Sequence, residues 1–133
     1  MFRRILSSFF VSLAILFSIS YSQDNILSVG NADIIAGETT NFEISLSNPN
    51  DVIAGFELYL TDFPNSYGTY ISVDGTDRTS GFTISANEQP DGTYIIVGFD
   101  LTLAGIQPGE GPIVSIGYQS DAIYTAEIDI HIG

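Results

Sequence analysis

After about its first two dozen residues, the chain consists of short runs in which apolar and polar residues alternate. In Phe42–Leu46 and in Phe56–Leu60, every second residue is apolar. This period of two is that of a β-strand with one buried face. No stretch of the same region repeats apolar residues at the helical spacing over three turns. The sequence therefore predicts an all-β fold with almost no helix.

Turn-forming residues separate the alternating runs. Asn48–Asp51 ends one run, and the pair Asp91–Gly92 favours a hairpin turn between two others. Strands that recur about every ten residues, with Gly, Pro, Asn or Asp between them, predict a sandwich of two antiparallel sheets. The runs that we expect to form its eight or nine strands cover residues 26–29, 32–35, 40–46, 54–60, 70–73, 82–86, 94–99, 113–117 and 128–132.

Residues 1–22 are predicted to be a secretory signal peptide. Arg3 and Arg4 give a basic start, and Ile5–Ile19 is an apolar run interrupted only by serines. A run of about 15 residues falls short of the roughly 20 that span a bilayer, so we expect cleavage and not a retained anchor. Of the 133 residues, removal of 22 leaves 111, which is the length of one domain, residues 23–133.

The chain is strongly acidic. It has 16 Asp and Glu residues against three arginines and no lysine, a net charge of −13. Loss of the signal peptide leaves Arg78 as the single cation and brings the net charge to −15. Such a field repels phosphate backbones and anionic lipids, so we expect neither nucleic acid nor a membrane as partner. A cationic partner or Ca²⁺ suits this charge, and solubility in a saline medium accounts for it equally well.

Groups for catalysis are scarce. The chain has no cysteine to serve as a nucleophile or to form a disulfide, and no Gly-x-Ser-x-Gly motif. Its one histidine, His131, lies at the end of an expected strand. Any two of the 16 acids could be nominated as a glycosidase pair, but solvated surface acids account for them as well. We therefore expect no enzyme, and no catalytic or cofactor-binding residue is assigned.

Four aspartates lie in or beside expected loops: Asp74, Asp77, Asp91 and Asp100. Carboxylate oxygens are the hard ligands that Ca²⁺ prefers. The spacing of a calcium loop, Asp-x-Asx-x-Asx-Gly, is absent, however, and the stretch from Asp74 to Asp77 fits an ordinary turn. A structural calcium ion therefore remains an alternative without a motif, and no metal ligand is assigned.

Four aromatic residues lie within twelve positions: Tyr59, Phe63, Tyr67 and Tyr70. Exposed aromatic rings on β-sandwiches can stack on the faces of sugar rings. Tyr59, Tyr67 and Tyr70 are therefore the candidate contacts with a carbohydrate or a protein partner. The chain has no tryptophan, Phe63 can equally pack into the core, and Tyr59 can simply cover a sheet face.

The order of five segments carries a resemblance to a known family. These segments are Val29–Ile35, Gly37–Thr39, Phe42–Leu46, Ala54–Leu58 and the glycine-rich lead into a strand at Gly109–Ile116. Their order and apolar pattern, between about Ile26 and Ile132, resemble the cohesin family.

The resemblance implies a nine-stranded jelly-roll sandwich without enzymatic activity. In cohesins, one sheet face binds a dockerin on a partner protein, often an enzyme that degrades polysaccharide. The residues that contact the dockerin vary, so none is carried over to this chain. The sequence stops where the family has one more strand, which usually pairs near the amino-terminal one. We therefore expect a chain truncated before its last strand, or part of a longer surface protein, with an exposed sheet edge.

Two functional hypotheses follow. The first is a secreted, non-catalytic, cohesin-like scaffolding module that binds a dockerin-type protein in an extracellular or cell-surface assembly linked to polysaccharide handling. The alternative is a carbohydrate-binding module that uses exposed tyrosines. A small hydrolase is a third possibility, and nothing particular in the sequence favours it.

Overall fold

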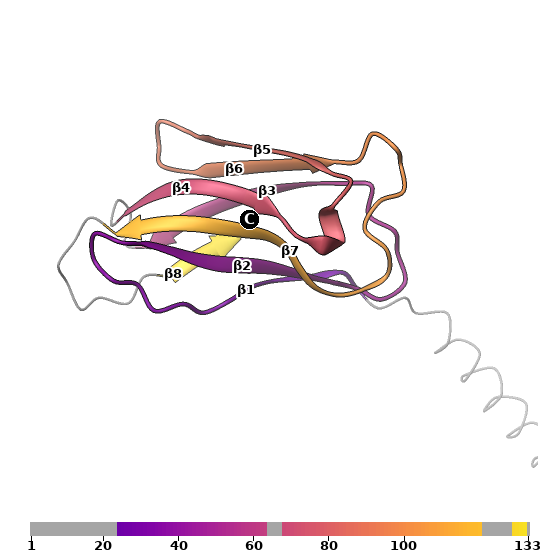
Figure 1. The fold of residues 1–133 in the computed structure, drawn as a ribbon, viewed down its shortest axis with the longest axis horizontal. Helices are drawn as coiled ribbons and strands as arrows, with labels where there is room; N and C mark the ends of the chain where they lie inside the picture. Colours follow the sequence, from indigo (N-terminus) through magenta and orange to yellow (C-terminus); the bar gives the residue numbers. More distant parts are fainter. Residues whose placement is uncertain (1–23, 64–67, 121–128, 133) are drawn as a thin grey trace, which may run out of the picture.

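Eight strands and one short 3-10 helix form the described part of the chain (Figure 1). The computed structural model describes residues 24–63, 68–120 and 129–132, so the expected signal peptide and Tyr67 lie outside the described residues. None of the described residues belongs to a helix long and apolar enough to cross a membrane. The elements are β1 (Ile26–Val29), β2 (Thr39–Asn48), β3 (Gly55–Phe63), β4 (Gly68–Gly75), η1 (Asp77–Thr79), β5 (Thr83–Glu88), β6 (Tyr94–Phe99), β7 (Gly109–Ser120) and β8 (Asp129–Ile132).

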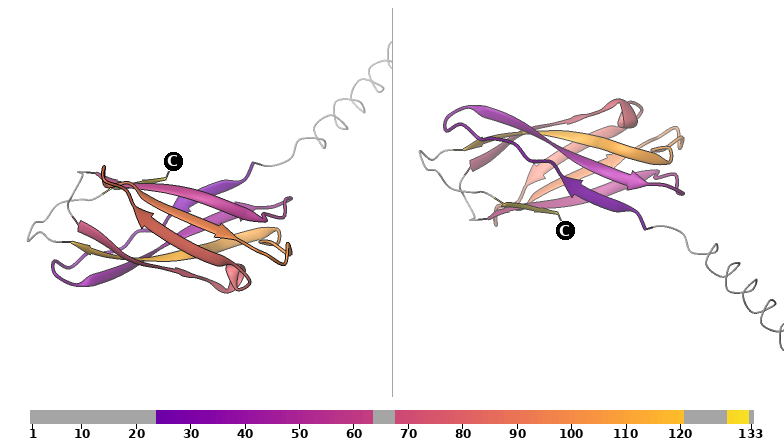
Figure 2. Two further views of the ribbon diagram at one scale, coloured as in Figure 1. Left: turned by 90° about the horizontal axis from the view of Figure 1, so that it is seen from above. Right: turned by 90° about the horizontal axis from the view of Figure 1, so that it is seen from below.

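The strands form two four-stranded sheets that face each other. One sheet has the order β1-β2-β7-β4 and the other the order β5-β6-β3-β8. All neighbouring strands are antiparallel. Figure 2 shows the strands of the two layers crossing at an oblique angle. The expected all-β fold, an antiparallel two-sheet sandwich with jelly-roll topology, is confirmed.

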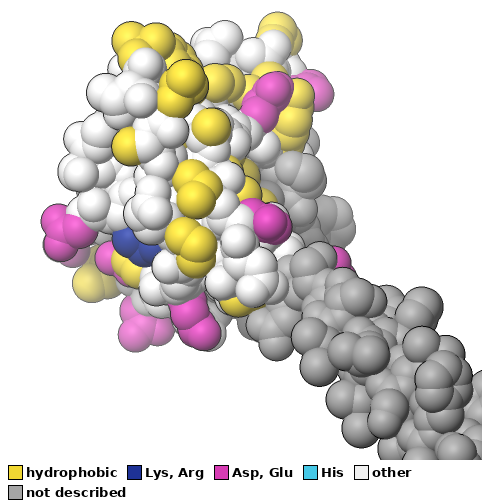
Figure 3. Space-filling model, turned by 90° about the vertical axis from the view of Figure 1, so that its right-hand side faces the viewer, with side chains coloured by type: hydrophobic (Ala, Val, Ile, Leu, Met, Phe, Trp, Pro, Cys, Tyr) yellow, Lys and Arg dark blue, Asp and Glu magenta, His cyan; other side chains and the backbone are white. Residues whose placement is uncertain are grey.

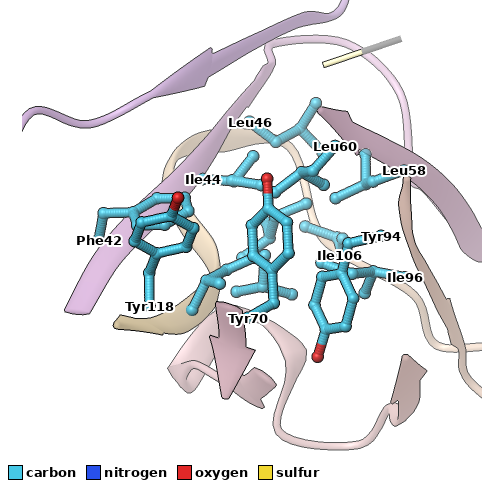
Figure 4. Close-up of a cluster of buried hydrophobic side chains, with 13 residues drawn as sticks. Phe42, Ile44, Leu46, Leu58, Leu60, Tyr70, Tyr94, Ile96, Ile106 and Tyr118 are labelled. Carbon is cyan, nitrogen blue, oxygen red and sulfur yellow. The ribbon is translucent and has the colours of Figure 1, made fainter. Parts of the chain in front are cut away.

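The core lies between the sheets and is built by alternate residues of the strands (Figure 4). Phe42, Ile44 and Leu46 of β2 are buried, as are Leu58 and Leu60 of β3, which confirms the alternation expected for both runs. Each large apolar side chain removed from water contributes about 1.5–3 kcal/mol to stability. The other buried apolar residues of the core are Tyr70, Tyr94, Ile96, Ile106, Ile113, Val114, Ile116 and Tyr118.

Arg78 of η1 ties several elements together. Its Nη1 donates to the carbonyl oxygens of Leu46 and Gly111, at 2.6 and 2.9 Å. Its Nη2 donates to Oδ1 of Asn48 at 2.6 Å and to the carbonyl oxygen of Gln107 at 3.2 Å. The guanidinium suits this role because its donors form a rigid planar fork. The single Lys or Arg side chain among the described residues thus joins η1 to β2, β7 and the loop before β7.

Residues 32–35 form no strand, which corrects one expectation from the sequence. The β1–β2 pairing continues as far as Gly30, whose N–H donates to the carbonyl oxygen of Glu43. Beyond it, no described strand pairs with this segment, and Ile35 is 60% exposed. The chain then turns at Gly37, which has a φ of 81°, a conformation that glycine adopts at no steric cost. The apolar pair Ile34–Ile35 resembled a strand, but without a neighbouring strand it has no ladder to join.

Candidate binding face

The outer face of the β5-β6-β3-β8 sheet carries a row of apolar side chains. On β6, Tyr94 and Ile96 point into the core, so Ile95, Val97 and Phe99 lie on the outer side. Phe99 is 41% exposed, and the other two are half-buried by their neighbours in the sheet. In the described part of the chain, no strand or helix packs over this face. We call these three side chains the β6 row.

The neighbouring strands frame the β6 row differently on its two sides. On β3, Tyr59 lies opposite Ile95 and Glu57 lies opposite Val97. Residues paired in this way have Cβ atoms about 4.5–5.5 Å apart. The β5 side instead carries small exposed polar residues, which are Thr83, Ser85 and Asn87. The face therefore has an apolar centre with an aromatic and acidic border along β3 and a small polar border along β5.

Tyr59 and Glu57 form a polar pair on this face. The side chain of Tyr59 is 42% exposed, and its hydroxyl donates a hydrogen bond to Oε1 of Glu57. That hydrogen bond, together with the negative charge of Glu57, raises the pKa of the Tyr59 phenol above its usual value. The phenol therefore stays protonated at neutral pH. The pair offers a flat ring and carboxylate acceptors to a ligand that covers the β6 row.

The structure places Tyr70 in the core and not on the surface. It is 7% exposed, its ring stacks on that of Tyr94 at 4.6 Å, and its edge contacts Tyr118 at 5.2 Å. Burial raises the pKa of its phenol, and the charge of Asp62 adds to the shift. Tyr70 therefore presents no ring face to a sugar. Of the three tyrosines singled out from the sequence, Tyr59 is the one that the described structure places at the surface.

Tyr118 and Asp62 form a buried polar pair near Tyr70. The hydroxyl of Tyr118 donates to Oδ2 of Asp62 at 2.8 Å, and both residues are buried. No pattern in the sequence singles out this carboxylate. A phenol and one enclosed carboxylate supply no nucleophile with an open position for a substrate. The pair instead joins β3 to β7 across the sandwich.

The four aspartates considered as calcium ligands do not meet at one point. Asp74 lies on β4, Asp77 begins η1, Asp91 lies in the β5–β6 turn and Asp100 follows β6. Among the residues that the structure describes, no group of three His, Asp or Glu side chains could hold one metal ion. The geometry thus gives no reason to assign a metal site to them.

The expected hairpin at Asp91–Gly92 is confirmed. It joins β5 to β6, and the N–H of Gln89 donates to the carbonyl oxygen of Thr93 at 2.8 Å. Gly92 has a φ of 90°, and Oδ1 of Asp91 accepts from the N–H of Thr93 at 2.9 Å. The backbone hydrogen bond from Thr93 lowers the pKa of Asp91. This turn sets the pairing of β6, and hence which of its residues face outward.

Comparison with known proteins gives a fold but no close relative. No family model matches the sequence, and the search of curated proteins found no match. Among solved structures, the sixth cohesin of Acetivibrio cellulolyticus scaffoldin B, in complex with a mutant Cel5 dockerin, superimposes with a TM-score of 0.67 at 19% identity, over 84% of this chain and 82% of that one. The chain has a cohesin-like fold.

Two further solved structures share this cohesin-like fold. A non-cellulosomal cohesin from the archaeon Archaeoglobus fulgidus has a TM-score of 0.62 at 16% identity, over 83% of this chain and 78% of that one. A type I cohesin–dockerin complex from Clostridium thermocellum has a TM-score of 0.63 at 18% identity, over 86% and 82%. The cohesin resemblance seen in the sequence is thereby confirmed at the level of fold.

The β6 row is the feature of the cohesin-like sandwich that sequence reasoning missed. In Tyr94–Phe99, every residue except Gly98 is apolar or aromatic. A strand that is apolar on both sides is typical of a strand covered on both faces. In a two-layer sandwich, however, only one face of each sheet is covered by the other sheet. A strand that is apolar on both faces, in a fold that covers only one of them, therefore indicates an uncovered apolar face.

Proposed function

We propose that this chain is an exported, non-catalytic binding module that takes a dockerin-type protein partner on the outer face of the β5-β6-β3-β8 sheet. The observation that carries the proposal is the β6 row, which lies on a regular sheet with nothing described over it. Exposed contiguous apolar surface on a soluble domain marks a site of association. The cohesin-like fold supports a dockerin-type partner, because two of the similar structures are cohesins in complex with dockerins.

The anatomy of the face fits a protein partner. Binding surfaces combine an apolar centre with a polar rim, and aromatic residues are frequent among their strongest contacts. Here Val97 lies at the centre, Tyr59 and Phe99 are the exposed aromatics, and Glu57 with the β5 residues supplies polar groups. The strands fix these side chains before binding, which lowers the entropy lost on association. The net charge of −13 favours a partner with basic side chains around its contact surface.

The sequence supports an extracellular setting for this binding. Residues 1–22 have the basic start and apolar run of an export signal. With a dockerin-type partner, the module would act in an extracellular or cell-surface assembly linked to polysaccharide handling. The catalytic step of such an assembly would belong to the partner.

The experiment that tests the proposal is a selection from a yeast-displayed library of dockerin modules against the purified chain. Val97→Asp places a charge in the centre of the face, and Ile71→Asp, at a side chain that is 49% exposed on β4 of the other sheet, is the matched control. We expect a selected module to bind Val97→Asp at least a hundredfold more weakly, because burying an unpaired charge is strongly unfavourable. Equal binding to both variants would refute this choice of face.

A carbohydrate is the alternative ligand for the same face. The observation that favours it is the exposed ring of Tyr59 at the border of the β6 row. In that case Tyr59→Ala would abolish retention on insoluble polysaccharide while the unfolding midpoint stayed unchanged. Retention that does not depend on Tyr59 would exclude this platform.

A further inference from the structure

The β6–β7 loop, which directly follows the β6 row, carries two further apolar side chains. Leu101 and Leu103 follow Ile95, Val97 and Phe99 at the same spacing of two residues. They are 79% and 77% exposed, more than any other large apolar side chain that the structure describes. Figure 3 looks onto the end of the molecule that holds this loop, and hydrophobic side chains lie at several places on its surface. Exposed apolar side chains are therefore present on the β6–β7 loop as well as on the sheet.

The shape of this loop is fixed by its own hydrogen bonds. Oδ1 of Asp100 accepts from the backbone N–H and the hydroxyl of Thr102, at 2.9 and 2.7 Å. Oδ2 of Asp100 accepts from the N–H of Gly105 at 3.0 Å, and the N–H of Leu103 donates to the carbonyl oxygen of Asp100 at 3.1 Å. The hydroxyl of Thr102 and the N–H of Gly105 lower the pKa of Asp100, so its carboxylate is charged at neutral pH. The two leucines are thus presented by a preformed turn.

Leu103 is held in an unfavourable backbone conformation. Its φ is 61°, and it is the single non-glycine residue with a positive φ in the described part of the chain. A leucine in the left-handed region is strained where a glycine is not. Its side chain is mostly exposed and so returns little packing energy to the fold. Strain of this kind persists where the surroundings impose it, and it is concentrated at functional sites.

We infer that Leu101 and Leu103 form an anchor that inserts into an apolar pocket of the dockerin-type partner, an inference that rests on the proposed function. Leu101 lies two residues beyond Phe99, the last side chain of the β6 row, so one partner can cover both. Val52, 51% exposed, lies beside Gly105 of the same loop, since its Cγ1 would lie 2.7 Å from a Cβ placed on that glycine.

The negative charge of this chain limits the kind of partner that can bind the anchor. Among the described residues the one cation, Arg78, is occupied by carbonyl and amide oxygens. Asp51 beside Val52 is exposed, and its Oδ2 accepts a hydrogen bond from the side-chain amide of Asn25 at 3.2 Å. The partner's pocket is therefore expected to have basic side chains at its rim. The same acidity opposes insertion of the two leucines into an anionic membrane, which favours a protein as the occupant.

The test measures binding and stability together, with a dockerin module selected on the wild-type chain as the probe. Leu101→Ser and Leu103→Gly each remove an anchor side chain, and Ile35→Ser removes an exposed one from the β1–β2 connection as the control. We expect each loop variant to bind the module at least tenfold more weakly, and the control to bind it as the wild type does. Leu103→Gly should also raise the unfolding midpoint, because it relieves the strain at this position. Leu103→Ala keeps the strain, so it should weaken binding without that gain.

The outcomes separate the anchor from the binding face. A module that loses binding to Val97→Asp but binds the loop variants as it binds the wild type overturns the anchor and leaves the proposed function standing. If no dockerin module is selected, the proposed function fails and the anchor fails with it. A lowered unfolding midpoint for Leu103→Gly would assign the leucine to the fold instead. Binding of the wild type, but not of Leu101→Ser, to phosphatidylcholine vesicles would replace the protein partner by a membrane.

Discussion

Two buried tyrosines, Tyr70 and Tyr118, provide a matched test of how the core treats polar groups. Their rings are in edge contact at 5.2 Å and both are buried. The hydroxyl of Tyr118 donates to the buried carboxylate of Asp62 at 2.8 Å, whereas within the described structure the hydroxyl of Tyr70 is buried without a hydrogen-bond partner. Replacing either by Phe keeps the ring and removes only the hydroxyl.

The two substitutions should act in opposite directions. Tyr118→Phe leaves a carboxylate oxygen of Asp62 enclosed without this donor, which should lower the free energy of unfolding by about 2–3 kcal/mol. Tyr70→Phe removes a hydroxyl that loses its hydrogen bonds to water on folding and has no hydrogen-bond partner in the described structure. The substitution should therefore be neutral or stabilise by about 1 kcal/mol. A difference of about 3 kcal/mol corresponds to roughly 10 °C in the melting temperature of a domain of this size.

Urea unfolding followed by circular dichroism measures both variants. A larger loss for Tyr70→Phe than for Tyr118→Phe would refute the reasoning. The pH dependence is a second readout. Because burial raises the pKa of Tyr70 in the folded state, the folded protein holds this proton more tightly than the unfolded chain does. The wild type should therefore lose stability as the pH rises above about 10, and Tyr70→Phe should lose less.

Four further substitutions have defined outcomes. Arg78→Lys should lower the free energy of unfolding by about 2 kcal/mol in urea titrations, because one ammonium cannot replace the four hydrogen bonds of the guanidinium. Folding lowers the pKa of Asp100, so its carboxylate stabilises the fold at a pH above its pKa in the unfolded chain. This stabilisation is lost as the pH falls through its pKa in the folded protein. Asp100→Asn should therefore lose less stability than the wild type below about pH 4. Gly98→Ala should destabilise by about 1–3 kcal/mol, since its Cβ would lie 2.6 Å from Cε1 of Phe56, whereas Gly37→Asn, at a positive φ in open space, should change the melting temperature little.

The alternation of apolar and polar residues predicted the strands well where one face of a strand is buried and the other is exposed to solvent. β2 and β3 follow this rule, and both were found nearly in full from the sequence. β4 breaks the rule because its pairing with β7 shifts between Tyr70 and Ser72. A bulge of this kind changes which residues face the core, so the alternation of β4 could not tell that Tyr70 is buried. That is why one of the three candidate contact tyrosines was misplaced.

The β6–β7 loop was predictable only in part. Asp100 followed two residues later by Thr102 is the pattern of a turn in which an aspartate side chain accepts from the backbone, and the structure contains that turn. A leucine at a positive φ was not predictable, because local preferences assign that conformation to glycine or asparagine. Leu103 therefore appears as a departure from local rules. Such departures tend to coincide with functional sites.

The register of β6 links the fold to the proposed binding face. A slip of one residue would exchange Ile95 and Val97 for Tyr94 and Ile96 on the outer side, and because all four are apolar the strand's own pattern does not exclude the slip. The packing around β6 excludes the slip. Gly98 lies opposite Phe56, whose ring occupies the space that a side chain at position 98 would fill and stacks on Phe82. The glycine therefore fixes the register that β6 itself leaves open. With the register fixed, β6 can be apolar on both faces, one for the core and one for a partner.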